Sequence, residues 1–356
     1  MKGMQGPSIF LAQFVRDDPP FDTLEGLASW AAQLGYVGIQ IPTSDRRVFD
    51  LAEASRSQSY CDDIRAMLSK YGLVVSELAA PLQGQVLAFH AAYGDLFQSF
   101  YPEGLSDAAR TEWAADQLRD VIAASLRFGT TTIPTLSGGL AWHLAYPWPQ
   151  RPPGLIDEAF QELAMRWLPL LDRAADAGLT FAFEPHPGSD IFDGATFEMF
   201  LERTGDHPAA CLNYDASHFV LQALDYVDFI RLYGKRIRGF HVKDAELRPS
   251  GRVGVYGGYQ DWRGRAGRFR SLGDGQVDFG RVFTALVEAE YEGWTTLEWE
   301  CCVKSPEQGA AEGAVFIARH LISPTTVAFD DFAGGKRDHA VNRRALGLPA
   351  ETNRDE

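Results

Sequence analysis

The sequence has few basic residues relative to its acidic ones. Lys and Arg number 33 and Asp and Glu 48, which gives a net charge of −15 over 356 residues. A protein this acidic repels polyanions, so neither nucleic acid nor an anionic membrane surface is an expected partner. No apolar run reaches the ~18 residues of a membrane-spanning helix, and residues 1–14 contain no basic region followed by an apolar stretch. We therefore expect a soluble, cytoplasmic protein.

Cysteine is also scarce. The four cysteines, two of them adjacent at Cys301 and Cys302, show neither C-x-x-C spacing nor the density of a disulfide-bonded domain. Two neighbouring thiols could bind a soft metal, but without a second pair the pattern favours reduced structural thiols. No glycine-rich phosphate loop follows the first predicted strand, which argues against a dinucleotide-binding fold.

A repeated strand-helix pattern does run along the chain. Short apolar runs alternate with longer amphipathic stretches, several of which end in glycine just before the next run, as at Gly35 and Gly129. The predicted strands are residues 8–14, 36–41, 73–78, 130–135, 180–184, 210–215, 237–242 and 294–299. Eight such units predict an α/β fold, a (β/α)8 TIM barrel over residues 1–322. A C-terminal tail, 323–356, is expected to wrap the barrel or a partner.

Three insertions account for the length beyond the ~250 residues of a typical barrel. Each follows a predicted strand and precedes a helix, at residues 79–106, 136–155 and 243–276. All three should therefore lie on the C-terminal face, where barrel enzymes have their active sites. Their many aromatic residues predict a deep pocket suited to sugar or aryl rings, unless the rings pack only against one another or against a neighbouring subunit.

Four successive predicted strands end in side chains that can bind a metal: Glu184, Asp215, His241 and Glu298. In register, they would place three carboxylates and one imidazole around one point, which is strongly unfavourable without a cation. Three oxygen donors and one nitrogen suit one hard or borderline divalent ion. Mn²⁺ is the first expectation, with Mg²⁺, Co²⁺ or Zn²⁺ as alternatives.

The surrounding motifs resemble those of the xylose isomerase-like TIM barrels, a family of sugar phosphate isomerases and epimerases. The motifs are EPHPG at 184–188, NYDASH at 213–218, FHVKD at 240–244, SLGDGQVDF at 271–279 and GWTTLEWE at 293–300. The resemblance extends over residues 10–318 and implies one divalent ion on the four side chains named above. It also implies that Glu184 and Glu298 act as acid and base, and that His218 binds a substrate oxygen.

The chemistry of these groups is consistent with that resemblance. A metal that chelates a carbonyl and its neighbouring hydroxyl stabilises the enediolate formed when the α-carbon loses a proton, and a nearby carboxylate can move that proton. We therefore expect a metal-dependent carbohydrate isomerase or epimerase. Because β-elimination shares this first step, a lyase that cleaves 3-keto-glycosides, as in the glycoside-cleaving branch of the family, is the alternative. A non-catalytic sugar-binding barrel is a third, less favoured interpretation.

Other residues are candidates for substrate contacts. His143, in the second insertion, is a candidate second base or aglycone contact, and Asp244 could orient the second imidazole nitrogen of His241 or bind a hydroxyl. The arginines of residues 252–270 suit a phosphate, unless they pair with acidic groups. The remaining substrate-binding candidates are His186, Gln13, Gln40, Trp142, Lys243 and Arg263.

The same family has a DNA-repair nuclease branch with three zinc ions, which needs histidines at the ends of the second and third strands. Here those strands end in Gln-Ile-Pro at 40–42 and Glu-Leu-Ala at 77–79. Together with the charge of −15, this argues against the nuclease interpretation. The expected partner is a small carbohydrate or glycoside. We also expect a homo-oligomer, and a small partner subunit could close the mouth of the barrel.

Overall fold

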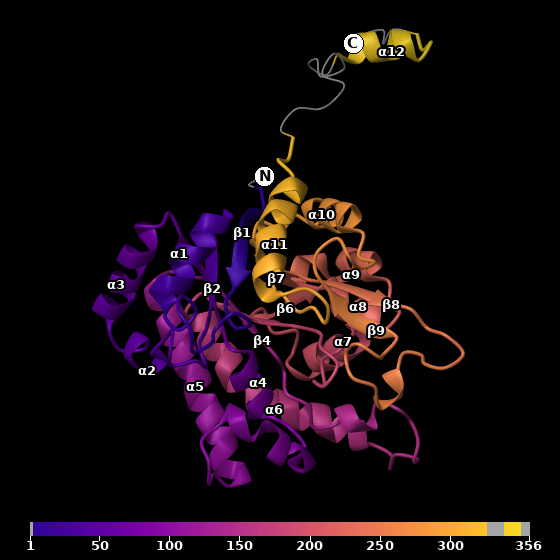
Figure 1. Cartoon of the computed structure of the whole chain (residues 1–356). Helices are drawn as coiled ribbons and strands as arrows, with labels where there is room; N and C mark the ends of the chain where they lie inside the picture. Colours follow the sequence, from indigo (N-terminus) through magenta and orange to yellow (C-terminus); the bar gives the residue numbers. More distant parts are fainter. Residues whose placement is uncertain (1–2, 326–337, 350–356) are drawn as a thin grey trace.

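The computed structural model describes residues 3–325 and 338–349, and a parallel sheet forms its centre (Figure 1). Within these residues the eight strands of the sheet are β1 Gln5–Phe10, β2 Gly38–Pro42, β3 Val74–Ala79, β4 Thr132–Thr135, β5 Thr180–Phe183, β6 Ala210–Asp215, β7 Ile237–Val242 and β10 Trp294–Leu297. Their order is β3-β2-β1-β10-β7-β6-β5-β4. The barrel is nearly closed, because Ala80, just after β3, donates its backbone N–H to the carbonyl of Pro134 in β4 at 2.8 Å. The predicted TIM barrel is confirmed.

Helices surround this barrel and connect its strands (Figure 1). They are α1 Leu24–Leu34, α2 Leu51–Ala54, α3 Gln58–Ser69, α4 Pro81–Leu87, α5 Asp107–Phe128, α6 Leu155–Asp176, α7 Gly194–Arg203, α8 Ala216–Leu221, α9 Tyr226–Tyr233, α10 Phe279–Glu288, α11 Pro306–His320 and α12 His339–Ala345. The glycines expected after α1 and α5 adopt the left-handed conformation, with φ of 96° at Gly35 and 75° at Gly129. Glycine ends each helix there without steric cost and directs the chain into the next strand.

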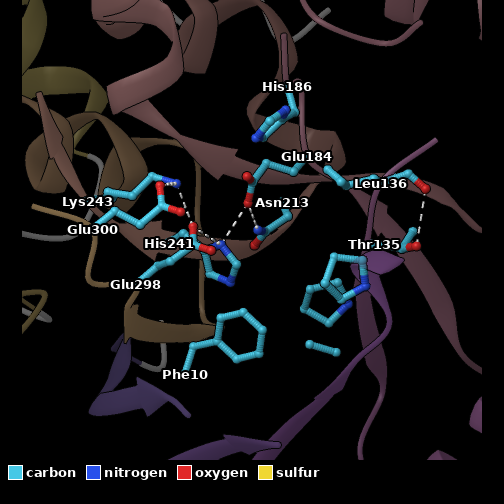
Figure 2. Close-up of a pocket in the computed structure, with 13 residues that line it drawn as sticks. Phe10, Thr135, Leu136, Glu184, His186, Asn213, His241, Lys243, Glu298 and Glu300 are labelled. Atoms are coloured by element: carbon cyan, nitrogen blue, oxygen red, sulfur yellow. Dashed lines mark hydrogen bonds and ion pairs between the residues drawn. The ribbon is translucent and has the colours of Figure 1, made fainter. Parts of the chain in front are cut away.

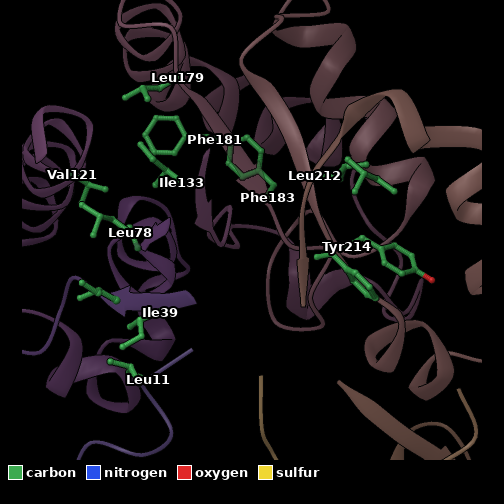
Figure 3. Close-up of a cluster of buried hydrophobic side chains, with 14 of the residues drawn as sticks. Leu11, Ile39, Leu78, Val121, Ile133, Leu179, Phe181, Phe183, Leu212 and Tyr214 are labelled. Carbon is green, nitrogen blue, oxygen red and sulfur yellow. The ribbon is translucent and has the colours of Figure 1, made fainter. Parts of the chain in front are cut away.

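Side-chain alternation in β5 determines what faces the barrel interior. Phe181 and Phe183 belong to the buried cluster that Figure 3 shows. They pack edge-on against Trp167 of α6, with ring centroids 5.2 and 4.7 Å apart. These rings are fully buried, and each contributes about 1.5–3 kcal/mol by leaving water. Because successive side chains of a strand point to opposite faces, Glu184 points away from α6 and into the barrel mouth.

The three insertions have more regular structure than loops. The first contains α4 and two short 3₁₀ turns, Ala91–Tyr93 and Asp95–Phe100, and the second contains a 3₁₀ turn at Trp142–Leu144. The third forms an antiparallel hairpin of β8, Asp244–Leu247, and β9, Gly267–Arg270. Many of the rings in the first two insertions pack against one another, as Phe89 does against Phe97 at 5.3 Å.

Two strands, β1 and β10, end two or more residues before the positions that the sequence predicts. The first was expected to reach residue 14, but β1 ends at Phe10 because Phe14 donates its N–H to the carbonyl of Leu11 at 2.9 Å and closes a turn. β10 ends at Leu297, so Glu298 lies one residue past the strand.

Residues 326–337 and 350–356 of the predicted tail lie outside the described residues, and its role stays a prediction. In the described part of the chain, no helix has the length and apolar character needed to cross a bilayer.

Candidate metal centre

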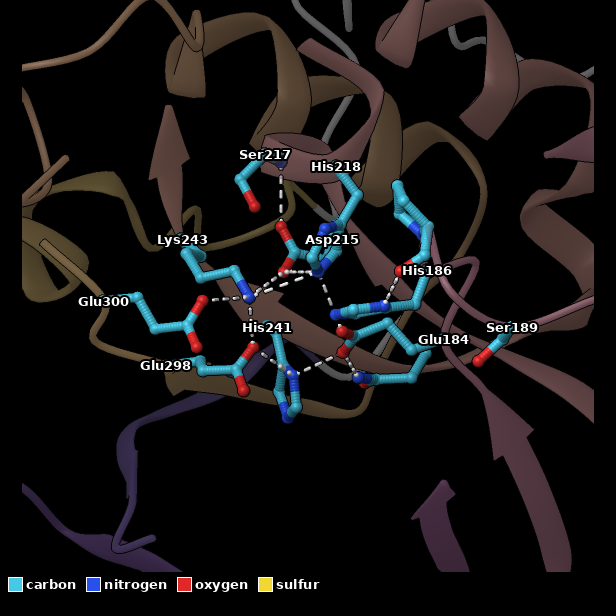
Figure 4. Close-up of polar contacts among 12 residues, drawn as sticks. Glu184, His186, Ser189, Asp215, Ser217, His218, His241, Lys243, Glu298 and Glu300 are labelled. Carbon is cyan, nitrogen blue, oxygen red and sulfur yellow. Dashed lines mark hydrogen bonds and ion pairs between the residues drawn. The ribbon is translucent and has the colours of Figure 1, made fainter. Parts of the chain in front are cut away.

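The four predicted ligands meet at the C-terminal mouth of the barrel. One ligand atom each from Glu184, Asp215, His241 and Glu298 lies within 4.8 Å of the others (Figure 4). Strand register produces this meeting, because Asp215 of β6 pairs with His241 of β7, and His241 pairs with Thr296 of β10, two residues before Glu298. The prediction that these side chains share one height is confirmed.

The donor atoms fit a divalent cation. The Nδ1 atom of His241 lies 2.7 Å from Oε2 of Glu184 and 3.0 Å from Oε2 of Glu298. Nevertheless, within the described residues neither Nδ1 of His241 nor Oδ2 of Asp215 makes an aligned hydrogen bond, although both are buried. Nδ1 of His241 instead faces two carboxylates, and Oδ2 of Asp215 faces the ammonium of Lys243 at 3.0 Å. Three carboxylates and one imidazole this close together form a ligand set that suits a divalent ion.

Electrostatics supports the same conclusion. Burial would lower the pKa of His241, but the charges of Glu298 and Glu184 outweigh it and raise the pKa well above its ordinary value. Without a cation, a proton on the imidazole offsets part of the negative charge of the cluster. A divalent ion would displace that proton, so binding of the ion releases a proton to solvent.

Two buried side chains hold the imidazole from behind. The Oε1 atom of Gln40 lies 3.0 Å from Nε2 of His241, and Nε2 of Gln40 donates to Oε2 of Glu77 at 2.7 Å. In this arrangement the Nε2–H of His241 donates a hydrogen bond to the amide oxygen of Gln40, and Nδ1 points toward the other candidate ligands. Burial raises the pKa of Glu77 to about 7.

Lys243 supplies a positive charge inside the cluster. Its Nζ lies 2.8 Å from Glu298, 3.0 Å from Asp215 and 3.3 Å from Glu300. Burial would lower the pKa of this lysine, but the three carboxylates raise it well above its usual value. The side chain is therefore a protonated ammonium group, held by the carboxylates around it.

The three carboxylates of the cluster differ in pKa. Burial would raise the pKa of Glu298, but Lys243 and His241 outweigh it and lower the pKa to about 2. Glu184 is held well below its ordinary pKa in the same way, by His241 and His218. In Asp215, by contrast, burial prevails and raises the pKa to about 7.

Two further histidines adjoin the cluster. Nε2 of His218 lies 3.0 Å from Oε1 of Glu184, and the rings of His218 and His186 are 4.2 Å apart. Burial lowers the pKa of His218 to about 3, so its imidazole is neutral. Glu184, His186 and His218 form a second group of potential ligand atoms within 4.8 Å of one another.

Several of these side chains line a cavity with an empty volume of about 410 Å³ (Figure 2). Its lining combines polar groups, Glu184, His241, Lys243 and Glu298, with apolar ones that include Phe10 and Leu136. Such a mixture of hydrogen-bonding groups and apolar surface suits a polyhydroxylated molecule.

The comparison with known proteins agrees with this fold. A model of the xylose isomerase-like TIM barrel family matches residues 28–320. The chain belongs to this family. An inosose dehydratase of Geobacillus thermodenitrificans is 33% identical over 129 residues, which covers 36% of this chain and only 43% of the relative. An inosose dehydratase of Geobacillus kaustophilus is 26% identical over 301 residues, covering 81% of this chain and 84% of the relative. A solved xylose isomerase-like TIM barrel protein from Mycobacterium smegmatis, in complex with magnesium, has a TM-score of 0.61 at 17% identity, covering 89% of this chain and 96% of that one.

The structure of this xylose isomerase-like barrel places some predicted substrate contacts at the cluster and others away from it. Gln13 donates from Nε2 to Oε1 of Glu298 at 3.1 Å. Gln40 and Asp244 are buried: Gln40 supports His241, and the carboxylate of Asp244 accepts backbone N–H groups, including those of Gly273 and Gly275. The second nitrogen of His241 is thus held by Gln40 and not by Asp244.

Three candidates from the long insertions, His143, Trp142 and Arg263, lie outside the lining of the cavity, whereas Lys243 is part of it. His143 is exposed and its ring lies 4.2 Å from that of His90, while Trp142 packs edge-on against Phe192. Arg263 donates to the backbone carbonyl of Cys302 at 3.2 Å. In these positions they do not contact the candidate ligands, because each packs against a residue outside the lining of this cavity.

Two residues that contact or support the candidate metal centre were not predicted. Asn213 donates from Nδ2 to Oε2 of Glu184 at 2.7 Å, and Glu77 anchors Gln40. Asn213 stands two positions before Asp215, so strand alternation places both on the same face and could have identified it. Glu77 lies opposite Gln40 in the register of β2 and β3, which only the structure reveals.

Proposed function

We propose that this protein is a divalent-metal-dependent lyase that acts on polyhydroxylated ketones, removing the proton next to the carbonyl and expelling the group on the following carbon. One observation carries the proposal. The ionised carboxylate of Glu298 and the ammonium of Lys243 lie 2.8 Å apart and line the same cavity. Elimination needs such a base and acid side by side.

The relatives support elimination over simple isomerisation. The match that covers 81% of this chain is to an inosose dehydratase. A dehydratase of this kind removes water from a polyhydroxylated ketone, the reaction class that a paired base and acid can perform.

The reaction follows from the positions of the side chains. Glu298 takes the proton from the α-carbon, the bond between the β-carbon and its oxygen breaks, and Lys243 gives a proton to the departing oxygen. The products are an unsaturated ketone and water or an alcohol. The protonated Glu298 then returns its proton to the neutral amine of Lys243 across 2.8 Å. Neutral His218, next to Glu184, suits a substrate hydroxyl.

A bound divalent ion would supply Lewis-acid polarisation of the substrate carbonyl. Glu184, Asp215, His241 and Glu298 are the residues that would hold it. Three oxygen donors and one nitrogen favour Mn²⁺, with Mg²⁺, Co²⁺ or Zn²⁺ as alternatives.

The proposal is tested by NMR of an inosose, keto-sugars and 3-keto-glycosides incubated with the protein and Mn²⁺ in D₂O. We expect loss of the β-substituent and the ultraviolet absorbance of an unsaturated ketone. If none of these ketones loses its α-proton, the proposal is wrong.

An isomerase or epimerase is the second candidate, and one observation favours it. Glu184 and Glu298 both approach Nδ1 of His241, at 2.7 and 3.0 Å, so two carboxylates face the same cavity. One could remove a proton and the other return it to the opposite face. In the same NMR experiment, deuterium at the α-carbon of a rearranged sugar, with no loss of the β-substituent, would identify this reaction.

A further inference from the structure

A second cavity adjoins the candidate active site. It has an empty volume of about 480 Å³ and is lined by Trp262, Phe269, Glu300, Cys301 and Cys302. Glu300 also lines the first cavity, where it pairs with Lys243 at 3.3 Å. The two cavities therefore share a wall at the side chain that neighbours the proposed acid.

The aromatic wall of the second cavity starts at the reacting groups. Nζ of Lys243 lies 4.7 Å from the ring centroid of Phe269, and the ring of His218 meets Phe269 edge-on at 5.4 Å. Trp262 stacks on Phe269 with centroids 4.7 Å apart. Phe269 thus connects the groups at the proposed site of bond cleavage with the exposed ring of Trp262.

The hairpin that carries this wall is firmly anchored. Glu246 of β8 accepts from Arg268 at 2.6 Å and Arg270 at 2.9 Å, both on β9. Trp262, between the two strands, still leaves 46% of its surface exposed. A large exposed ring on a supported hairpin, beside a candidate active site, is typical of a ligand contact.

The lining also indicates what the second cavity would bind. It offers two rings, two thiols and one carboxylate, and that carboxylate already pairs with Lys243. A second sugar needs several hydrogen-bond partners, whereas a planar aromatic group needs apolar contact and polarisable neighbours such as thiols. The lining of the second cavity therefore favours an aromatic ring over a second sugar.

We propose that the second cavity binds an aromatic group attached to the reacting carbohydrate, so that the substrate is an aryl-substituted keto-sugar. This inference rests on the proposed function, because it assigns the first cavity to the reacting ring. Arg265, whose guanidinium carbon lies 4.8 Å from the ring centroid of Trp262, supports the orientation of that wall.

The test is calorimetric titration of the Mn²⁺-loaded protein with phenyl β-glucoside and methyl β-glucoside. The two compounds differ only in the group on the anomeric oxygen, which is phenyl in one and methyl in the other. We expect the phenyl compound to bind about tenfold more tightly, the gain that burial of one aromatic ring can give. Trp262→Ala should reduce that preference to about twofold or less, and Trp262→Phe should restore most of it. Tyr256→Ala, which removes an exposed ring of the same insertion outside the cavity lining, should leave it unchanged.

Equal affinities, no measurable binding of the phenyl compound, or an unchanged preference in Trp262→Ala would each overturn the inference. Neither glycoside has a ketone, so the titration requires no turnover. A negative titration together with α-proton exchange on an unsubstituted ketone would refute the aromatic subsite alone. Absence of exchange with every ketone would instead refute the proposed function.

Discussion

The side-chain oxygen of Gln40 lies 3.0 Å from Nε2 of His241, on the opposite side of the imidazole from the other candidate ligands. Glu77 holds Gln40 in turn, at 2.7 Å. The orientation of the imidazole of His241, a candidate metal ligand on β7, is therefore determined by residues of β2 and β3.

Gln40→Leu should weaken Mn²⁺ binding by about 10- to 100-fold, because the imidazole loses the partner that fixes its orientation. Isothermal titration of the folded variant with Mn²⁺ measures this effect. Gln33→Ala, which removes an exposed amide from α1, is the matched control and should bind Mn²⁺ like the wild type. Unchanged affinity in Gln40→Leu would show that Gln40 does not act through His241.

Glu298→Gln should abolish α-proton exchange, with a loss of at least about 10²-fold, because the amide cannot accept the proton. The comparison is made at saturating Mn²⁺, so that weaker metal binding does not contribute. Its fold should remain intact by circular dichroism, and Glu288→Gln, on the exposed face of α10, should keep full activity. Wild-type exchange in Glu298→Gln would refute the assignment of Glu298 as the base.

Lys243→Met should separate the two halves of the proposed elimination. Glu298 can still remove the α-proton, but no ammonium is present to protonate the leaving oxygen. We expect deuterium exchange in D₂O to exceed elimination by a larger ratio than in the wild type. If both rates fall by the same factor, Lys243 acts on metal or substrate binding and not as the acid.

The hairpin of the third insertion should respond to acid through Glu246. Burial opposes its ionisation, but Arg268 and Arg270 outweigh burial and lower its pKa below the ordinary 4.5. The ionised form therefore stabilises the fold fully above pH 4.5, and this contribution is lost as the pH falls through the lowered pKa.

We expect Glu246→Gln to lower the Tm by a few degrees at pH 7, roughly what a loss of 1 kcal/mol causes in a protein of this size. The difference from the wild type should shrink as the pH is lowered below the range of free carboxylates. Glu53→Gln, an exposed glutamate of α2, serves as the control. A Tm difference that does not vary with pH would contradict the ion-pair explanation.

The sequence was sufficient to predict the barrel and the position of the four candidate metal ligands. Alternation in parallel strands is strict, so Glu184 and Asp215, each at the end of a buried strand, could only point to the barrel mouth. The contacts of the long insertions were not predictable in this way. The structure places His143 against His90 and Asp244 under the backbone of the hairpin, because local packing and turn hydrogen bonds determine these positions.

Contacts between side chains of different strands could not be predicted from the sequence either. Gln40 has the sequence position of a substrate contact, and only the pairing of β2 with β3 brings Glu77 beside it. In the same way, the contact of Lys243 with Phe269 depends on how the hairpin folds back over β7.

We propose that a divalent ion on Glu184, Asp215, His241 and Glu298 enables removal of a proton next to a carbonyl. The most direct measurement is the rate of deuterium incorporation into an inosose by the chelator-treated protein, before and after Mn²⁺ is added. We predict no exchange above background without metal, and exchange restored by Mn²⁺ in the wild type but not in Glu298→Gln. Equal rates of deuterium exchange with and without metal would show that proton removal does not require the ion.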